Sequence, residues 1–442
     1  MKKAMFLPDS VRLCISTLEN AGYQAYAVGG CVRDSLLGLT PHDYDLCTNA
    51  LPEETAWVFR EYTLVRSGKK HGTIGVVIEK QVIEITTFRT EGGYRDNRHP
   101  DWVRFVRCLR EDLARRDFTV NAMAYNPECG YIDLFDGQKD LQKGILRAVG
   151  DPQKRFSEDA LRILRGVRFA VRFSLTPTPD TLAAMENLAP LMDNLARERV
   201  FDELCKLLPL VTAKDLTTYT QVLTQVLPPL ASCVGFSQHN PHHIYNVYTH
   251  TAYVVEAAAP RLAVRWAAVL HDCGKPSCFE IGEKGIGHFY GHAQVSAQIA
   301  DELLLQLKSP TALRERVVFL IDQHMTPLEP DKKILRRKLG KYGADALTDL
   351  VELQRADAIG TGTCEDTHRF AAISALIAEI LSEQACLTIR DLEINGRDLQ
   401  DLGFAPGPQM GACLQRLLEQ VQDEFLPNER QALLTAATQF FQ

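Results

Sequence analysis

The chain has 442 residues, of which 45% are hydrophobic and 24% charged, with a formal net charge of −7 at pH 7. This composition is typical of a globular protein, the length predicts roughly two to four domains, and the absence of any apolar run of about 20 residues excludes a membrane-spanning helix. We expect no signal peptide, and no C-x-x-C pair occurs among the 12 cysteines, so we predict a reducing, cytoplasmic location and no membrane partner.

The negative charge is concentrated in the C-terminal fifth of the chain. Residues 351–442 hold 6 Lys+Arg and 14 Asp+Glu, whereas residues 1–350 hold 43 and 42. An RNA-binding surface built from local arginine clusters is therefore still possible in the first part of the chain.

The first 150 residues alternate short strand-like runs with helical runs. The sequence predicts a helix at CVRDSLLG (31–38) and strands at QAYAVGG (24–30), DYDLCT (43–48), GTIGVVIE (72–79) and QVIEITTFR (81–89). We therefore expect a mixed α/β domain here.

A glycine pair and two acidic residues occupy the start of this domain. Asp43 and Asp45 lie two apart on a predicted strand, so their carboxylates share a face and repel each other unless a cation lies between them. Mg²⁺, bound through carboxylates and substrate phosphates, suits such a pair. Gly29 and Gly30 allow the backbone to approach a phosphate, and Arg33 adds a cationic fork. A solvated turn is the alternative to this nucleoside triphosphate site.

Segment 158–173, EDALRILRGVRFAVRF, has the pattern of an amphipathic helix with an arginine face. Because no acidic residue follows Asp159 in this segment, the arginines would repel one another on a solvated face. We therefore expect a triphosphate or RNA phosphate against them, with an ordinary charged face as the alternative. Asp159 and Arg162 together offer an acceptor and donors for the polar edge of a base. The arginines of this face are Arg162, Arg165, Arg168 and Arg172.

Four motifs together resemble the class II tRNA nucleotidyltransferase and bacterial poly(A) polymerase superfamily, over roughly the first 230 residues. They are VGGCVRDSLLG (28–38), HDYDLCT (42–48), LARRDFTVNAMAY (113–125) and DPQKRFSEDALRILRGVRFAVRF (151–173).

The resemblance implies that Asp43 and Asp45 hold catalytic Mg²⁺ ions. It gives Asp117 a structural role, and Glu84 on the neighbouring predicted strand could be a third carboxylate or a solvated strand residue. It also implies that Asp159 and Arg162 read C or A. The residues that it places against the nucleotide are Gly30, Arg33, Arg116, Asp159, Arg162, Arg165 and Arg168.

Two further segments separate the members of this superfamily. SGKKHGTIGVVI (67–78) resembles the tRNA-specific members, and RTEGGYRDNRHPDWVRFV (89–106) resembles the flexible loop of enzymes that add the terminal A. The resemblance therefore implies template-independent addition or repair of the 3′-terminal CCA of tRNA, with CTP, ATP and the tRNA 3′ end as partners. An A-adding tRNA nucleotidyltransferase and a poly(A) polymerase are the alternatives.

A second set of motifs follows a linker predicted at 226–243. His250, then His271-Asp272, then Asp357 have the order H…HD…D of the HD phosphohydrolase superfamily. This resemblance implies that these four residues hold a divalent metal of unknown identity, which can activate water for attack on a phosphate ester. His292 and His324 lie where some members carry additional ligands. Histidines satisfied without a metal are the alternative.

The expected fold class is α+β, a nucleotidyltransferase-type mixed α/β head followed by helical parts. We expect the head at 1–150, a helical neck and body at 151–230, a helical HD domain at 240–375 and a helical acidic tail at 376–442. An HD phosphohydrolase whose head only recruits RNA, and a non-catalytic RNA-binding protein, are rival hypotheses. The sequence does not decide the oligomeric state.

Two segments of the helical part have no assigned role at this point. GEKGIGHFYGH (282–292) is glycine-rich, and DKKILRRKLGKYG (331–343) carries six basic residues and one acidic residue. The basic segment could contact RNA phosphates or be a solvated helix face.

Overall fold

The structure described here is a computed structural model, which covers residues 4–92, 102–240, 244–282, 285–362 and 367–441. Residues 93–101 of the predicted loop and 241–243 of the predicted linker lie outside the described residues. None of the described helices is long and apolar enough to cross a membrane.

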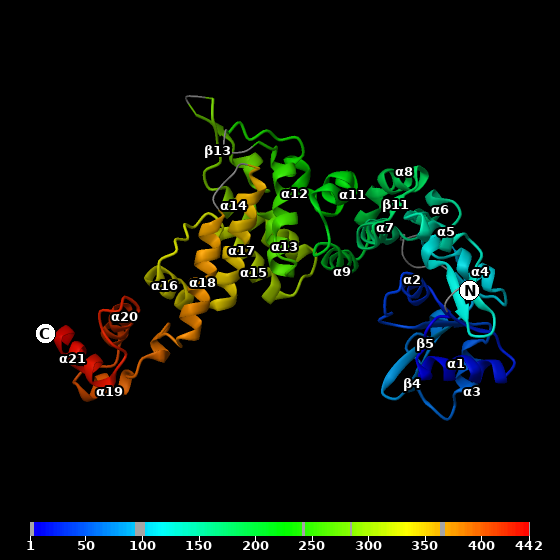
Figure 1. Ribbon diagram of the computed structural model, residues 1–442, viewed down its shortest axis with the longest axis horizontal. Helices are drawn as coiled ribbons and strands as arrows, with labels where there is room; N and C mark the ends of the chain where they lie inside the picture. Colours follow the sequence, from blue (N-terminus) through cyan, green and yellow to red (C-terminus); the bar gives the residue numbers. More distant parts are fainter. Residues whose placement is uncertain (1–3, 93–101, 241–243, 283–284, 363–366, 442) are drawn as a thin grey trace. The chain divides into compact units, whose positions relative to one another are not determined.

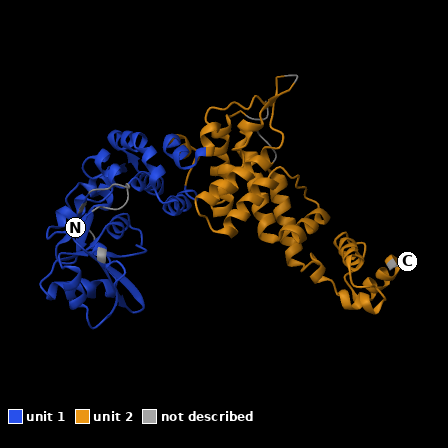
Figure 2. Cartoon of the chain, turned by 180° about the vertical axis from the view of Figure 1, so that it is seen from behind, with its two compact units in different colours: residues 1–210, 219–228 blue, residues 211–218, 229–442 orange. Residues whose placement is uncertain are grey.

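The chain forms two compact units (Figure 2). Residues 1–210 and 219–228 make the first unit, and residues 211–218 and 229–442 make the second. The predicted head falls in the first unit, as does the predicted neck at 151–230 except for residues 211–218 and 229–230. The fold is a mixed α/β head with a mostly helical remainder, as expected.

A seven-stranded sheet forms the head. Its strands are all antiparallel to their neighbours except for the parallel pair β2–β5. All four predicted strands are confirmed, although the second begins only at Asp45. The order across the sheet is β3 (Thr63–Val65), β4 (Thr73–Ile78), β5 (Gln81–Thr87), β2 (Asp45–Thr48), β1 (Ala25–Val28), β8 (Met123–Asn126) and β9 (Gly130–Asp133).

Both faces of the central strands are buried. Leu46 of β2 belongs to one apolar cluster, together with residues of α1 (Asp9–Asn20) and with Phe59, which follows α3 (Pro52–Val58). Cys47, the next residue of β2, belongs to the opposite cluster, which includes α4 (Leu109–Ala114). Because side chains alternate along a strand, Asp45 lies on the same face as Cys47.

The remaining elements of the head flank this sheet. Strands β6 (Arg89–Gly92) and β7 (Trp102–Phe105) form an antiparallel ribbon at the two ends of the predicted loop. Helix α2 (Gly30–Leu36) follows β1, and α5 (Gly137–Gln142) follows β9.

The predicted helix over 158–173 begins only at Leu161, as α7 (Leu161–Phe173), and Glu158 is the last residue of the preceding helix α6 (Pro152–Glu158). Asp159 interrupts them with an extended backbone, φ −139° and ψ 102°. Helix α7 then packs on α9 (Arg197–Leu207). The other elements of this region are β10 (Ile145–Leu146), β11 (Thr176–Pro177), α8 (Pro179–Asn187) and α11 (Thr220–Val226).

The second unit is helical apart from the short hairpin β12 (Glu280–Ile281) and β13 (Gly287–His288) in its described residues (Figure 1). Helix α12 (Val247–Ala257) packs closely on α17 (Ala344–Gly360), where a Cβ on Gly360 would lie 2.3 Å from Val254 Cγ2. The other helices are α10 (Ala213–Thr218), α13 (Leu262–Leu270), α14 (His292–Gln306), α15 (Thr311–Gln323), α16 (Lys332–Tyr342), α18 (His368–Ser382), α19 (Gly396–Asp401), α20 (Pro408–Gln422) and α21 (Arg430–Phe441).

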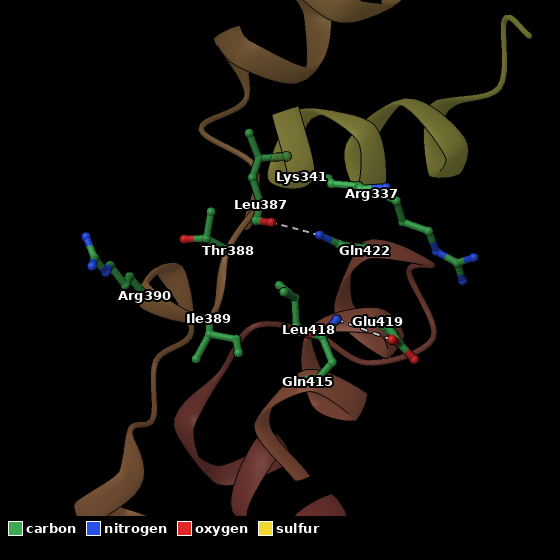
Figure 3. A pocket seen from close by; sticks show the side chains of 11 residues that line it. Arg337, Lys341, Leu387, Thr388, Ile389, Arg390, Gln415, Leu418, Glu419 and Gln422 are labelled. Atoms are coloured by element: carbon green, nitrogen blue, oxygen red, sulfur yellow. Dashed lines mark hydrogen bonds between the residues drawn. The ribbon is translucent and has the colours of Figure 1, made fainter. Parts of the chain in front are cut away.

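The basic segment 331–343 forms α16, and the acidic end of the chain neutralises part of it. Lys332 Nζ lies 2.8 Å from Glu379 Oε1 and 2.7 Å from Glu383 Oε1. Arg337 Nη2 lies 2.5 Å from Asp423 Oδ2. Between α16, residues 387–390 and α20 lies a cavity of about 800 Å³ (Figure 3).

Candidate functional site

The glycine pair forms a sharp turn between β1 and α2. Gly29 has φ +79°, a conformation that side chains rarely adopt, and its N–H donates to Met123 O at 3.1 Å. A Cβ at Gly29 would lie 2.9 Å from Arg116 Nη1. The missing side chain thus allows the guanidinium of Arg116 to lie against the turn, where it could meet an anion.

The two aspartates flank the start of β2. Asp45 pairs in register with Val28, so it lies directly beside the turn. Asp43 is exposed, and its Oδ1 lies 2.9 Å from His42 Nδ1. Asp45 also reaches solvent, yet desolvation by the surrounding protein raises the pKa of its carboxyl, Arg116 lowers it and Asp43 raises it further. A divalent cation between the two carboxylates would relieve their repulsion, so this donor set fits Mg²⁺.

Glu84 lies beside this pair on the neighbouring strand. Leu46 pairs with Ile85 in the parallel ladder of β2 and β5, so Asp45 and Glu84 each come one residue earlier and share a face of the sheet. The structure thus brings together the glycine turn, Arg116, Asp45 and the strand position of Glu84.

Arg33 is held by the protein on several sides. It is only 5% exposed, its Nη2 donates to Asp34 Oδ1 at 2.6 Å and its Nη1 donates to Asn121 Oδ1. Its guanidinium lies 4.2 Å from the centre of the Phe173 ring. Desolvation lowers the pKa of Arg33, although Asp34 raises it. Arg33 therefore links α2 to the end of α7, whether or not it also contacts a bound nucleotide.

A buried carboxylate, Asp117, continues this link. Its Oδ2 accepts from Arg165 Nη2 at 2.7 Å and from Nε at 3.0 Å, and its Oδ1 accepts from Asn121 Nδ2 at 3.1 Å. Burial by itself would raise the pKa of Asp117, but Arg165 and these hydrogen bonds lower it to about 2. A continuous chain of polar contacts thus runs from Arg33 through Asn121 and Asp117 to Arg165.

Three of the arginines that we expect to face a phosphate have carboxylate partners within the protein. Arg165 has Asp117, Arg168 Nε lies 2.5 Å from Glu203 Oε2, and Arg162 Nη1 lies 3.0 Å from Glu158 Oε2. Asp117 and Glu203, which are distant in the sequence, and Glu158, at the end of α6, therefore balance part of the charge of this helix face.

Asp159 does not pair with Arg162 in this structure. Its Oδ2 accepts from Arg199 Nη2 at 3.0 Å, and its Oδ1 accepts from the N–H of Leu161 at 3.1 Å. Arg162 instead donates to the backbone carbonyls of Arg155 and Arg115 as well as to Glu158. Sequence reasoning missed Arg199, which no local motif marks.

In the second unit, the structure brings together the four residues of the H…HD…D pattern and the two additional histidines, His292 and His324. His250 Nε2 lies 3.2 Å from Asp272 Oδ2 and 3.0 Å from Asp357 Oδ1, and His271 Nε2 lies 3.2 Å from Asp272 Oδ2. The ligand atoms of two overlapping groups lie within 4.8 Å of one another. They are His250, His271 and Asp272, and Asp272, His292 and His324.

The ring orientation of the four histidines favours metal binding. Each Nδ1 faces a backbone carbonyl, which would hold a proton there and leave the Nε2 lone pair for a metal. Because Asp272 belongs to both groups, the arrangement could hold two ions. Imidazole nitrogens with carboxylate oxygens suit transition metals. The carbonyls are those of Gly360 for His250, Ala268 for His271, Phe289 for His292 and Ile321 for His324, at 2.9, 2.9, 2.8 and 2.6 Å.

Lys275 also belongs to this cluster of histidines and aspartates. Sequence reasoning missed it, although it lies only three residues after Asp272. Its Nζ lies 2.6 Å from Asp272 Oδ2 and 2.8 Å from Gln238 Oε1. A cavity of about 540 Å³ opens beside the cluster and is lined in part by Asp272, Lys275 and Asp357.

Comparisons with known proteins cover nearly the whole chain. Residues 25–147 match the family described as Poly A polymerase head domain, residues 174–231 the probable RNA and SrmB-binding site of polymerase A, and residues 280–437 the putative domain 2 of tRNA nucleotidyltransferase. The CCA-adding enzyme of Levilactobacillus brevis is 36% identical over 97% of each chain, and that of Streptococcus gordonii is 33% identical over 97% of each.

Solved structures agree with these matches. The Bacillus stearothermophilus CCA-adding enzyme in complex with CTP superposes with a TM-score of 0.73 at 27% identity, covering 97% of this chain and 96% of that one. The Thermotoga maritima CCA-adding enzyme complexed with tRNA shares the fold, with a TM-score of 0.60 at 20% identity and coverage of 99% and 97%.

Replacement of Asp117 tests the buried link between head and neck. Because the folded pKa of about 2 lies below the ordinary value of 3.8, the charged carboxylate stabilises the fold above pH 4, and this stability is lost as the pH falls from 4 towards 2. Asp117→Asn should lower the free energy of unfolding at pH 7 by about 3 kcal/mol. The difference from the parent should be constant between pH 7 and 5 and smaller at pH 3.5, as measured by urea unfolding.

The exposed Asp180→Asn in α8 is the matched control and should stay within about 0.5 kcal/mol of the parent. A deficit for Asp117→Asn that does not change between pH 7 and 3.5 would contradict the account.

Proposed function

The chain belongs to the family of CCA-adding enzymes, and from this premise we propose which of its residues carry out the reaction. The enzyme is a tRNA nucleotidyltransferase that adds the 3′-terminal CCA of tRNA. CTP and ATP are its nucleotide substrates and the tRNA 3′ end is its acceptor, which is consistent with a cytoplasmic location.

We propose that Asp43 and Asp45 hold Mg²⁺ beside the glycine turn of the head. In the reaction, the oxygen of the tRNA 3′-hydroxyl bonds to the α-phosphorus of CTP or ATP, its proton is lost, and the bond from that phosphorus to pyrophosphate breaks. Bound Mg²⁺ ions would activate the hydroxyl and stabilise the charge of the leaving group. The observation that carries this assignment is the meeting of Asp45, the Gly29–Gly30 turn and Arg116.

The neighbouring cationic groups would bind the triphosphate. Arg116 is the best placed, because its guanidinium lies against the turn, its side chain is 21% exposed and its Nη2 lies as far as 3.5 Å from its carboxylate partner, Asp112 Oδ2. Arg33, Arg165 and Arg168 are held more closely, by carboxylates at 2.6, 2.7 and 2.5 Å. They would act mainly by fixing the turn and α7 relative to each other, and would reach a phosphate only by exchanging a partner.

We assign base selection to Asp159 and Arg162 at the break between α6 and α7. Asp159 offers a carboxylate acceptor that Arg199 orients, and the extended backbone lets it point away from the helix axis. Arg162 is held by Glu158 and by two carbonyls, so it must exchange one of these partners to donate to a base. A charged acceptor next to a multi-donor guanidinium can match the edge of C or A.

The first variant tests the metal pair. Asp45→Asn should reduce incorporation of labelled CMP into tRNA that ends at the discriminator base by at least about 10³-fold, because metal-assisted charge stabilisation is worth several kcal/mol. The thermal midpoint should stay near that of the parent, since the strand keeps its backbone and its apolar contacts. Asp9→Asn, at the exposed start of α1, is the control. Near-normal incorporation by Asp45→Asn would disprove the assignment.

The second variant separates base choice from nucleotide binding. Asp159→Ala should bring the kcat/KM values for CTP and UTP closer by about tenfold, because a bidentate base contact is worth about 1–3 kcal/mol of discrimination. Arg199→Ala should have the same effect to a lesser degree, since it removes only the orienting partner. If both variants kept the parental CTP to UTP ratio, base choice would have to reside elsewhere.

A second activity, metal-dependent hydrolysis of a phosphate ester, is our proposal for the region 240–375. It is supported by the four histidines whose Nδ1 atoms face backbone carbonyls and by Asp272 between the two candidate metal groups. His250, His271, Asp272 and Asp357 would hold one ion, and Asp272, His292 and His324 a second. Divalent ions there would activate water for attack on phosphorus.

The chain's own residues define the rest of this step. The water oxygen bonds to phosphorus, the bond from phosphorus to the ester oxygen breaks, and that oxygen takes a proton. Lys275, bound to Asp272 and Gln238, places a positive charge at the edge of the cavity where the phosphate would lie. The family matched at 280–437 is described as a domain of tRNA nucleotidyltransferase, so support of the tRNA alone is the competing role for this region.

Substitution of Asp272 tests this second activity and its independence from CCA addition. Asp272→Asn should abolish hydrolysis of a nucleoside 2′,3′-cyclic phosphate assayed with Mg²⁺, Mn²⁺, Ni²⁺ and Co²⁺ in turn. It should also lower the metal content of the purified full chain, and leave CMP incorporation within a few-fold of the parent. Asp345→Asn, exposed on α17, should change none of these. No hydrolysis by the parent with any metal would leave the region as a structural support for tRNA.

A further inference from the structure

Two phenylalanines interrupt the arginine face of α7. Phe169 comes four residues after Arg165 and one after Arg168, and Phe173 is the last residue of the helix. Their rings stack, with centroids 6.1 Å apart and an interplanar angle of 28°. Phe169 is only 4% exposed. Because a charged helix face that met only solvent would not bury an aromatic ring, we examined what this ring contacts.

Three guanidinium groups lie over the Phe169 ring. The ring centroid is 4.4 Å from Cζ of Arg168, 5.1 Å from Cζ of Arg165 and 5.2 Å from Cζ of Arg33. These distances fall within the roughly 6 Å over which the negative face of an aromatic ring attracts a cation. The ring therefore joins Arg33 of α2 to two arginines of α7, and it offsets part of the repulsion among the three cations.

The same guanidiniums are held at their edges by other groups. A guanidinium donates hydrogen bonds in its own plane, so its flat face stays available to an aromatic ring. Arg165 donates to Asp117 through both Nε and Nη2. Arg33 donates to Asp34 and Asn121. The carboxylates and the amide thus restrain each guanidinium within its plane, and the ring restrains it across that plane.

The Phe169 ring is itself seated on a second aromatic side chain. Phe118, the residue after Asp117, meets it edge to face, with centroids 5.9 Å apart and an interplanar angle of 86°. Gly166 of α7 makes room for Phe118, because a Cβ there would lie 3.0 Å from Phe118 Cζ. A glycine inside a helix weakens that helix relative to alanine, so its presence here favours the close approach of the ring. The segment that carries Asp117 therefore also sets the position of the Phe169 ring.

We propose that Phe169 is a positioning residue for nucleotide addition. Its ring holds the guanidiniums of Arg33 and Arg165, so that α2, which follows the glycine turn, and α7, which follows the helix break at Asp159, keep one fixed separation. The inference rests on the proposed function, which places the triphosphate at that turn and the base at that break. A displacement of about 1 Å between reacting groups can cost about 10²-fold in rate, so a weaker contact at this ring should lower kcat.

Graded fluorination of the ring tests this role with little change in packing. Fluorine withdraws electrons from the face of the ring, which weakens its attraction for a cation while the ring keeps nearly the same size. Phe169 is replaced in the full chain by its 4-fluoro, 3,5-difluoro and 3,4,5-trifluoro analogues. The kcat for CMP incorporation into tRNA should fall stepwise, to about tenfold below the parent for the trifluoro protein. The KM for CTP should stay within about threefold, because Arg116 still meets the triphosphate.

Phe59 is the matched control for this series. It is fully buried in the head, in the apolar cluster on the sheet face opposite Asp45, and it packs edge to face on Tyr62 with centroids 5.9 Å apart. The same analogues at Phe59 should leave kcat within about twofold of the parent. Phe169→Leu keeps an apolar side chain without a ring and should lower kcat at least as far as trifluorination, whereas Phe59→Leu should lower only the thermal midpoint.

The results separate this inference from the proposed function on which it rests. If Asp159→Ala keeps the parental CTP to UTP ratio while fluorination at Phe169 still lowers kcat, base choice resides elsewhere and the positioning role stands. If Asp45→Asn abolishes incorporation but kcat is constant across the Phe169 series, the metal site stands and the inference is overturned. An equal fall of kcat in the Phe59 series would overturn it as well, because the ring would then contribute only packing.

Discussion

The buried carboxylate of Asp117 joins the two parts of the first unit. It receives hydrogen bonds from Arg165 of α7 and from Asn121, and Asn121 in turn accepts from Arg33 of α2. The turn that would hold the triphosphate and the helix break that would choose the base are therefore linked through one charge. Within a water-poor interior such a chain of charged groups has few alternative partners, which favours one fixed arrangement. Selection of a base by protein side chains, as we propose for Asp159 and Arg162, requires that these side chains keep fixed positions.

Features that depend on residues close together in the sequence could be predicted, whereas most contacts between distant segments could not. The strands of the head follow from period-two patterning and the sheet confirms them, but β2 begins only at Asp45, so Asp43 lies just before the strand rather than on it. The second cluster was predicted from the order of four residues in the sequence, His250, His271, Asp272 and Asp357. In the structure these residues lie together with His292 and His324. The carboxylate partners of the arginines were not predictable, because Glu203 and Asp117 lie far from them in the sequence. The same holds for Arg199 beside Asp159 and for the break at Asp159 itself.

The charge counts along the chain likewise did not reveal that the acidic and basic segments pair with each other. The acidic surplus after residue 351 and the basic run of α16 look like two separate features in the sequence. In the structure Glu379, Glu383 and Asp423 pair with Lys332 and Arg337, so each partly cancels the other. Any RNA contact of α16 must therefore use the side that remains, such as Lys341 at the cavity of Figure 3.

Gly360 shows how a residue without a side chain can set the dimensions of a chemical site. Its carbonyl orients His250, and its missing Cβ lets α17 lie against α12 at Val254. Asp357 is on the same helix, nearly one turn earlier, so the separation of the two helices also fixes how far its carboxylate stands from the imidazoles. A larger residue at 360 would push α17 away from α12 and so increase the distance between Asp357 and the imidazoles. Substitution of this glycine should therefore impair the cluster as much as substitution of one of its candidate metal ligands, although Gly360 itself would donate no atom to a metal.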